Sequence, residues 1–174
     1  MKRILLNSFF LCFLFLLPSP VITASPFGGS KHSELVLLPI KISALTNKTF
    51  ISKGEEFKLH LSILVKEGWH IYSLNPFQGR ESLATQILMD KNNFQEQSEW
   101  KGPDPVLIKD GALDKIVKGY RGRIEFSKTY IVPISVAPKI YSLTGNIALR
   151  ACDNQICTLP RKFPFHTEIK VKAY

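Results

Sequence analysis

Two cysteines near the C-terminus, Cys152 and Cys157, are the residues whose type and spacing best suit chemistry. Four residues separate them, and the first two, Asp153 and Asn154, favour turns. The alternating sequence on either side predicts strands, so the pair is expected at the tip of a β-hairpin, close enough to form a disulfide. Such a bond would serve either as a structural cross-link or as a redox centre that opens and closes.

Strand parity predicts that Cys152 points away from the protein core. It shares the parity of Asn146 and Ala148, whereas Ile147 and Leu149 have the opposite parity and are expected to be buried. A cysteine that faces outward can meet a partner protein.

Three interpretations of the pair remain open from these residues. A structural disulfide would close a very short loop, which removes only roughly 2 kcal/mol of unfolded-state entropy, against nearly 5 kcal/mol for a 100-residue loop. A tetrahedral zinc site could combine the cysteines with His60, His70 or His166. However, the cysteine spacing is wider than usual and the histidines form no ligand motif. A redox-active pair is the third interpretation.

The first 24 residues are predicted to be a secretory signal peptide. The basic start Met1-Lys2-Arg3 precedes an apolar run from Ile4 to Leu17, and Ala24 is a small residue suited to cleavage. The apolar run is shorter than the roughly 20 residues that span a bilayer. The third cysteine, Cys12, lies inside this run, so cleavage would leave the C-terminal pair as the only thiols.

We expect residues 25–33 to form a flexible leader and residues 34–174 to form a single domain. No later segment is long and apolar enough to cross a membrane. Without the signal peptide, 21 Lys and Arg stand against 14 Asp and Glu. The lysines are scattered and no nucleic-acid motif is evident, so the charge is interpreted as a solubility feature rather than a nucleic-acid interface. The sequence indicates no cofactor.

Apolar residues recur with a period of two, and no segment has a convincing helical stripe. This alternation predicts strands with one buried face, separated by turn signals such as Lys53-Gly54. The fold class is therefore predicted to be all-β, an antiparallel immunoglobulin-like β-sandwich. The candidate strands are residues 35–44, 57–63, 85–89, 130–136, 145–151 and 163–171.

Three sequence blocks together resemble the N-terminal domain of the thiol:disulfide interchange protein DsbD. They are Gly68-Trp69-His70-Ile71-Tyr72-Ser73 followed by Asn75-Pro76, then Gly119-Tyr120-Arg121-Gly122, then Ala151-Cys152 to Cys157-Thr158-Leu159-Pro160. The resemblance extends from about residue 35 to residue 171, and the cysteine block is its most specific part. It implies a bacterial periplasmic domain with an immunoglobulin-like fold, which agrees with the predicted export.

The resemblance also implies roles for individual residues. Cys152 and Cys157 match the redox cysteines, with Cys157 as the cysteine that bonds to a partner. Tyr72 matches an aromatic position beside them, with His70 on the same strand face, and Tyr120 falls in the region of a cap loop that shields the disulfide. Gly111, Gly119 and Gly122 are expected to let this loop move. The sequence has no clear equivalent of the acidic cap residues of that family, although Asp110 and Asp114 lie nearby.

The partners implied by the resemblance are redox proteins. A thioredoxin-like or membrane thiol reductase would donate electrons, and a periplasmic disulfide isomerase-type protein would accept them. The printed sequence contains neither of the membrane and thioredoxin-like domains that follow in full-length DsbD, so the donor is expected to be another protein. The spacing of the cysteines is also one residue shorter than in the enterobacterial form. The alternative function is a non-catalytic exported β-sandwich binding module with a structural hairpin disulfide.

Overall fold

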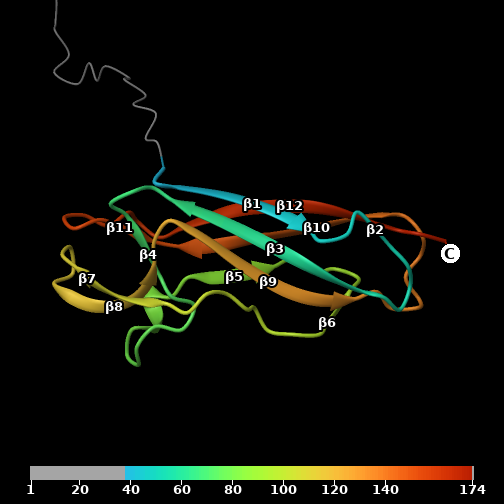
Figure 1. Cartoon of the computed structure of the whole chain (residues 1–174), viewed down its shortest axis with the longest axis horizontal. Coiled ribbons are helices and arrows are strands. Elements are labelled where there is room, and N and C mark those ends of the chain that lie inside the picture. The colour runs from blue at the N-terminus through green and yellow to red at the C-terminus, as the bar shows by residue number, and fades with distance from the viewer. Residues whose placement is uncertain (1–37, 174) are drawn as a thin grey trace, which may run out of the picture. The chain divides into compact units, whose positions relative to one another are not determined.

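The computed structural model of the chain describes residues 38–173 (Figure 1). The predicted signal peptide, the leader and the start of the expected strand 35–44 lie outside the described residues. Within residues 38–173, the regular elements are strands apart from one 3-10 turn, η1 (Glu81–Leu83). No helix in this part of the chain is long and apolar enough to cross a membrane.

The strands form three sheets of four strands each. The first sheet has the order β1 (Ile40–Thr46), β3 (Glu56–Val65), β9 (Arg123–Ile131) and β6 (Gln95–Glu96). The second has the order β2 (Phe50–Ile51), β12 (Arg161–Val171), β10 (Ile140–Leu149) and β5 (Gln86–Met89). The third has the order β11 (Ala151–Cys152), β4 (His70–Tyr72), β8 (Lys115–Tyr120) and β7 (Val106–Asp110).

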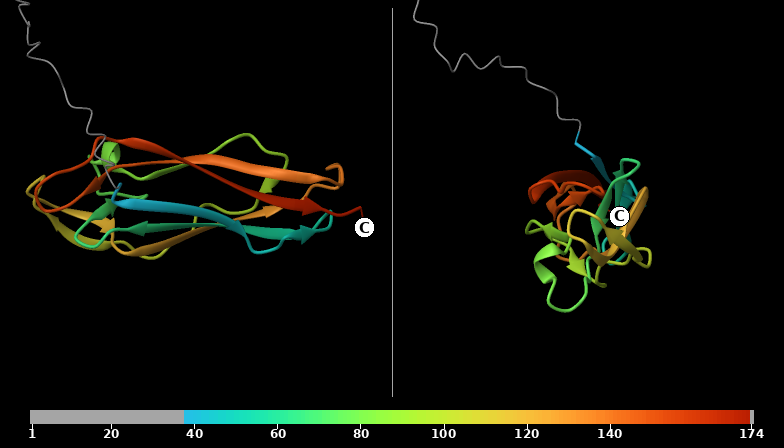
Figure 2. Two further views of the ribbon diagram at one scale, coloured as in Figure 1. Left: turned by 90° about the horizontal axis from the view of Figure 1, so that it is seen from above. Right: turned by 90° about the vertical axis from the view of Figure 1, so that its left-hand side faces the viewer.

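This arrangement confirms the predicted immunoglobulin-like β-sandwich. All strand pairs are antiparallel except β2 with β12, which run parallel. Figure 2 shows β10 and β12 on one side of the domain and β3 and β9 on the other. The alternating residues of these strands fill the space between them. Leu59, Leu61 and Phe126 are fully buried there, in what we call the main core.

The predicted strands 57–63, 85–89 and 163–171 correspond to β3, β5 and β12. The prediction for 130–136 is wrong beyond Ile131, where β9 ends. Val132 and Val136 are buried in the main core, but they reach it from a loop, and Ile134 between them is exposed. The apolar alternation of the sequence therefore continues past the end of the strand, whereas alternating burial stops at Val132.

The third sheet lies at one end of the sandwich (Figure 1). The chain leaves the second sheet after Leu149, and after Arg150 the residues Ala151 and Cys152 pair with β4 instead of continuing along β12. This switch brings Cys152 opposite His70 in the neighbouring strand. Short strands in the third sheet therefore position the cysteines beside the residues of β4.

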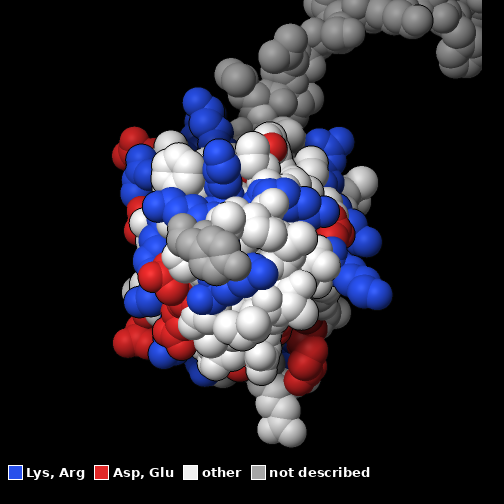
Figure 3. Space-filling model, turned by 90° about the vertical axis from the view of Figure 1, so that its right-hand side faces the viewer, with Lys and Arg blue, Asp and Glu red and all other residues white. Residues whose placement is uncertain are grey.

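Basic and acidic side chains are mixed on the opposite end of the domain. Figure 3 views that end and shows Lys and Arg interspersed with Asp, Glu and uncharged residues. The view contains no single continuous basic patch, in agreement with the scattered lysines of the sequence.

Candidate functional site

Cys152 and Cys157 form a disulfide at the tip of a β-hairpin. The two residues make an antiparallel bridge, and the hairpin continues through a hydrogen bond of 2.8 Å from the Thr158 amide to the Ala151 carbonyl. The hairpin predicted from the sequence is therefore present. We call residues 152–157 the disulfide loop.

The Asp153 side chain organises this loop independently of the sulfur atoms. Its Oδ1 accepts hydrogen bonds from the amides of Gln155, at 2.7 Å, and Ile156, at 2.8 Å. The Asp153 amide also donates to the Ile156 carbonyl at 3.0 Å. The hydrogen bonds from Ile156 and Gln155 lower the pKa of Asp153 below its usual value. Hydrogen bonds among residues 153–156 therefore stabilise the turn in addition to the disulfide.

The two sulfur-bearing residues differ in exposure. Cys152 is 0% exposed, whereas Cys157 is only partly buried. Strand parity correctly predicted that Cys152 points away from the main core. The prediction that Cys152 is accessible to a partner protein is wrong, because its side chain is buried. A second apolar cluster covers that face, and it contains Tyr72, Ile108, Val117 and Cys152. We call it the disulfide cluster.

Tyr72 connects both sulfur atoms to a buried carboxylate. Its hydroxyl donates a hydrogen bond of 2.6 Å to Asp110 Oδ2. The same hydroxyl oxygen lies 3.0 Å from Cys152 Sγ and 3.8 Å from Cys157 Sγ. Burial is the main reason that the pKa of Tyr72 is raised well above its usual value, with Asp110 adding to the effect. Tyr72 therefore remains protonated and keeps its hydrogen to donate.

His70 lies on the same face of β4 as Tyr72, as expected, while Ile71 between them faces the main core. His70 Nε2 is 3.3 Å from Asp110 Oδ2, and both side chains are almost fully buried. Burial lowers the pKa of His70, and this effect outweighs the opposing influence of Asp110. The imidazole is therefore neutral at pH 7, and the contact is a hydrogen bond rather than a full ion pair.

Asp110 is the site residue whose role the sequence did not reveal. It is 0% exposed, and besides His70 and Tyr72 it binds the amide of Leu113 through Oδ1 at 3.1 Å. A signal was present, because Asp110 shares the parity of Ile108, whose side chain is buried in the same cluster. An acidic residue on the buried face of a strand needs hydrogen-bond donors around its carboxylate. Its position in the sequence therefore predicts a buried polar network.

The turn between β7 and β8, residues 111–114, covers the disulfide cluster. Leu113 from this turn and Leu83 from η1 pack against the cluster. The turn also approaches the disulfide loop so closely that a Cβ on Gly111 would lie 2.4 Å from the carbonyl oxygen of Asn154. The cover over the disulfide is therefore at residues 111–114, and the region 119–122 suggested by the sequence does not provide it.

Tyr120 is not brought to the disulfide. It is the last residue of β8, its side chain belongs to the main core, and its ring centroid is 5.5 Å from that of Phe126. Gly119 and Gly122, which were predicted to make a cap loop mobile, have other roles in the structure. A Cβ on Gly119 would lie 2.5 Å from the carbonyl oxygen of Ile71, so Gly119 permits close strand packing. Gly122 has a positive φ of 68° in the turn before β9.

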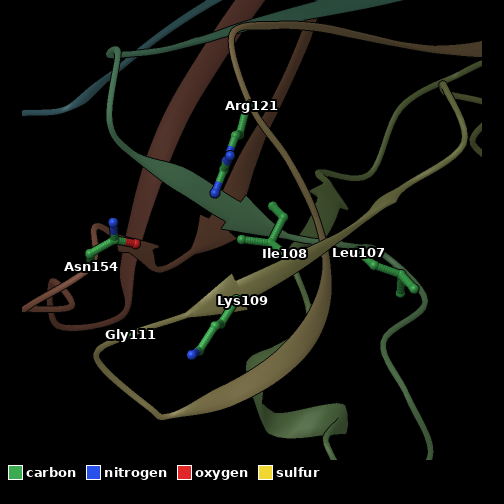
Figure 4. A pocket seen from close by; sticks show the side chains of 6 residues that line it. All are labelled: Leu107, Ile108, Lys109, Gly111, Arg121 and Asn154. Carbon is green, nitrogen blue, oxygen red and sulfur yellow. The ribbon is translucent and has the colours of Figure 1, made fainter.

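An open pocket adjoins the disulfide loop (Figure 4). The side chains of Arg121 and Asn154 reach it from the turn after β8 and from the disulfide loop, and Lys109 reaches it from β7. It therefore offers two cations beside the loop, but neither cysteine lines it. The lining residues are Leu107, Ile108, Lys109, Gly111, Arg121 and Asn154.

Three potential metal-binding atoms converge at the site. One ligand atom from each of His70, Asp110 and Cys152 lies within 4.8 Å of the others. Of the histidines considered from the sequence, His60 is on β3 and His166 on β12, so neither belongs to this group.

These features define a class of domain, an immunoglobulin-like β-sandwich with a hairpin disulfide packed against a buried Tyr–Asp–His network. Residues 41–168 match the family described as the N-terminal part of the thiol:disulfide interchange protein DsbD, and the chain belongs to this family. The resemblance noted in the sequence is thereby confirmed. Thiol–disulfide exchange is the general function of the family.

One solved structure supports the fold assignment. The chain is similar to the N-terminal periplasmic domain of ScsB from Proteus mirabilis, with a TM-score of 0.55 and 19% sequence identity. The match covers 75% of this chain and 48% of that one, so the chain spans about half the length of this structural relative. A family 123 glycoside hydrolase from Clostridium perfringens matches with a TM-score of 0.37, 10% identity and coverage of 76% of this chain and 27% of that one. A comparison with curated proteins found no match.

Proposed function

We propose that this protein is an exported electron-relay domain that works in the periplasm through a reversible Cys152–Cys157 disulfide. It would accept electrons from a thioredoxin-like or membrane thiol reductase and pass them to a periplasmic disulfide isomerase-type protein. The single observation that carries this proposal is the position of Tyr72, whose hydroxyl oxygen contacts both sulfur atoms while it donates to Asp110. A cross-link that only holds a hairpin has no need of this network.

Reduction begins at the more accessible of the two cysteines. A thiolate of the donor attacks Cys157 Sγ, because Cys157 is partly exposed and Cys152 is not. The bond between the two sulfurs breaks, and its electron pair moves to Cys152 as a thiolate. The second thiol of the donor, as a thiolate, then attacks the donor's own sulfur in the mixed disulfide and releases Cys157. Cys152 and Cys157 take up two protons, equal in number to those that the donor thiols lost, so the donor becomes a disulfide and this protein becomes a dithiol.

The buried network supports the sulfur that leaves. Because the Tyr72 hydroxyl donates its hydrogen bond to Asp110, its oxygen presents lone pairs toward Cys152 Sγ at 3.0 Å. A protonated Cys152 thiol can donate its S–H to that oxygen. The network therefore holds the reduced Cys152 in place as a neutral thiol in an apolar cluster, where an unpaired thiolate would be costly.

Delivery of electrons is the reverse sequence. The Cys157 thiolate attacks the disulfide of the acceptor, and a mixed disulfide forms. Cys152, after loss of its proton, attacks Cys157 Sγ, re-forms the internal disulfide and releases the reduced acceptor. Cys157 is thus the residue that contacts partners in both directions, and Cys152 is the resolving residue.

The alternative is a binding module in which the disulfide only pins the hairpin. Two features favour the relay over this module. The Asp153 hydrogen bonds already hold the loop, and a disulfide that closes so short a loop adds only roughly 2 kcal/mol.

A trapping experiment tests the assignment of the two cysteines. The partner is a thioredoxin-like protein that keeps only its attacking cysteine, activated as a mixed disulfide with thionitrobenzoate. Cys152→Ala, which leaves Cys157 free, is expected to displace thionitrobenzoate and form a stable complex. The matched variant Cys157→Ala leaves only the buried thiol and should react at least about tenfold more slowly. Equal rates in the two variants would contradict the assignment.

The reduction potential separates the two functions. Structural disulfides in exported proteins lie below about −300 mV, and a relay requires a higher value. The measurement is the equilibrium of the wild-type protein with a series of dithiol buffers. A potential below that limit would favour the binding module.

A further inference from the structure

The disulfide end of the domain gathers the donor atoms of a metal site. His70 Nε2, Asp110 Oδ2 and Cys152 Sγ lie within 4.8 Å of one another, and all three side chains are buried. Cys157 Sγ, which is bonded to Cys152 Sγ, lies 3.8 Å from the Tyr72 hydroxyl oxygen. The same oxygen contacts Cys152 Sγ and Asp110 Oδ2. One nitrogen, one oxygen and one sulfur atom therefore meet in one place, and the second sulfur, Cys157 Sγ, is bonded to the first.

The spacing of these atoms suits a tetrahedral Zn²⁺ ion. Zinc binds nitrogen and oxygen at about 2.0–2.2 Å and sulfur at about 2.3 Å, so the ligands of a tetrahedral site are about 3.3–3.8 Å apart. His70 Nε2 and Asp110 Oδ2 already lie 3.3 Å apart. The distances to Cys152 Sγ are below 4.8 Å, so shifts of about 1 Å complete that part of the site.

We propose that the reduced protein binds one Zn²⁺ through His70, Asp110, Cys152 and Cys157. In the oxidised protein the sulfurs are bonded to each other and are not thiolates, so the site does not exist. A phosphine supplies two electrons and becomes a phosphine oxide with the oxygen of water, whose two protons convert the sulfurs to thiols. A dithiol supplies the two electrons and the two protons itself and becomes a disulfide. Zn²⁺ then replaces the two thiol protons, which leave to solvent, and forms two zinc–sulfur bonds. His70 contributes the lone pair of Nε2, with its proton on Nδ1.

The surroundings favour such a site. Tyr72 donates a hydrogen bond to Asp110 Oδ2 and would orient the carboxylate as an outer partner of the metal. Ile108 and Val117 form an apolar wall around the donors, while the partly exposed Cys157 provides an entry path for the ion. A mixed set of thiolate, imidazole and carboxylate ligands suits Zn²⁺ better than Mg²⁺ or Ca²⁺, which prefer oxygen alone.

Zinc binding would have a functional consequence. The ion would occupy the same two thiolates that exchange with partners, so the zinc-bound protein would resist reoxidation until the metal is removed. The zinc proposal needs only that the disulfide can be reduced chemically, and it does not depend on the electron relay. The trapping experiment contains no metal and tests only the relay. A negative result in one experiment therefore does not decide the other proposal.

Cobalt provides a direct spectroscopic test on the wild-type protein. The purified chain is reduced with a phosphine, separated from the reductant under nitrogen and titrated with Co²⁺. We expect one equivalent to bind, with intense tetrahedral ligand-field bands and sulfur-to-cobalt charge-transfer bands, both removed by Zn²⁺. The oxidised protein should give neither. A six-coordinate spectrum, or no binding to the reduced protein, would overturn the proposal without any need for a variant.

Competition with a chromophoric chelator then identifies the ligands. His70→Gln and Asp110→Asn should each weaken Zn²⁺ binding to the reduced protein at least about tenfold. The matched control is His166→Gln, because His166 is exposed on β12 and should not affect the affinity. Wild-type affinity in both His70→Gln and Asp110→Asn would mean that the two sulfurs alone bind the ion, and the four-residue site would be wrong.

Discussion

The Tyr72 hydroxyl lies 2.6 Å from Asp110 Oδ2 and 3.0 Å from Cys152 Sγ, so a single oxygen atom joins a buried carboxylate to the less accessible sulfur of the disulfide. The three side chains come from three strands of the third sheet, β4, β7 and β11. The sheet therefore holds its strands together partly through this network. Changes within it should affect both stability and sulfur chemistry.

Tyr72→Phe is expected to destabilise the oxidised protein by about 1–3 kcal/mol, because buried Asp110 loses a hydrogen-bond donor. Urea unfolding at pH 7 measures the change. Tyr130→Phe is the matched control, since the buried Tyr130 hydroxyl has no hydrogen-bond partner within residues 38–173. Its removal should leave the stability unchanged or increase it. Equal losses in the two variants would show that the network contributes nothing specific.

His70 should make the unfolding free energy decrease as the pH falls below about 6.5, the usual pKa of a histidine. Burial lowers its pKa in the folded protein, so the unfolded chain binds the proton first as the pH falls. The contribution of neutral His70 is therefore complete above pH 6.5 and decreases as the pH falls below it. Urea unfolding at a series of pH values should show this decrease in the wild type.

The matched variants isolate the effect of that one ring. His70→Gln cannot titrate and should lose the decrease, whereas His166→Gln removes an exposed histidine and should retain it. Only the slope with pH is compared, because His70→Gln also changes the hydrogen bond to Asp110. The same slope in His70→Gln and wild type would exclude His70 as its source.

Gly111→Ala should uncover the disulfide. Its new Cβ would meet the Asn154 carbonyl oxygen at 2.4 Å, so the turn over the disulfide cluster and the disulfide loop must move apart. We expect dithiothreitol to reduce the variant several-fold faster than the wild type. The control is Leu107→Ala, which changes an exposed residue of the same pocket without a close backbone contact. An unchanged rate in Gly111→Ala would mean that the turn does not limit access.

Much of the fold followed from the sequence because long strands repeat the alternating pattern often enough to be recognised. β3 and β12 are 10 and 11 residues long, and both were predicted. β4 has three residues and β11 has two, too few for a period to appear. These short strands form because they pair with segments that are distant in the sequence. A local sequence pattern carries no information about such pairing.

The site was predicted in part for the same reason. The sequence identified the hairpin from neighbouring residues, and the resemblance to the DsbD N-terminal domain placed His70 on the same strand face as Tyr72. It did not assign the covering turn to residues 111–114, because that contact joins the β7–β8 turn to the disulfide loop across the fold. Likewise, Cys152 is buried because residues of β7 and β8 pack over it in the disulfide cluster. Strand parity gives only the direction of a side chain and not whether other strands cover it.

Asp153→Ala distinguishes a loop held by hydrogen bonds from one held by its disulfide. The Asp153 carboxylate accepts from the amides of Gln155 and Ile156, so the variant should exchange both amide hydrogens faster in the oxidised and the reduced protein. In the wild type, chemical reduction should leave both amides protected. Asp153→Asn keeps an oxygen acceptor and should behave like the wild type.

Hydrogen exchange followed by NMR measures both amides in all of these states. If reduction alone removes their protection in the wild type, the disulfide is the element that holds the loop, and the structural alternative gains support. If protection persists, the loop keeps its shape when the bond opens. Cys157 then remains positioned beside Cys152, ready to close the disulfide again, which is the property that a domain exchanging electrons repeatedly requires.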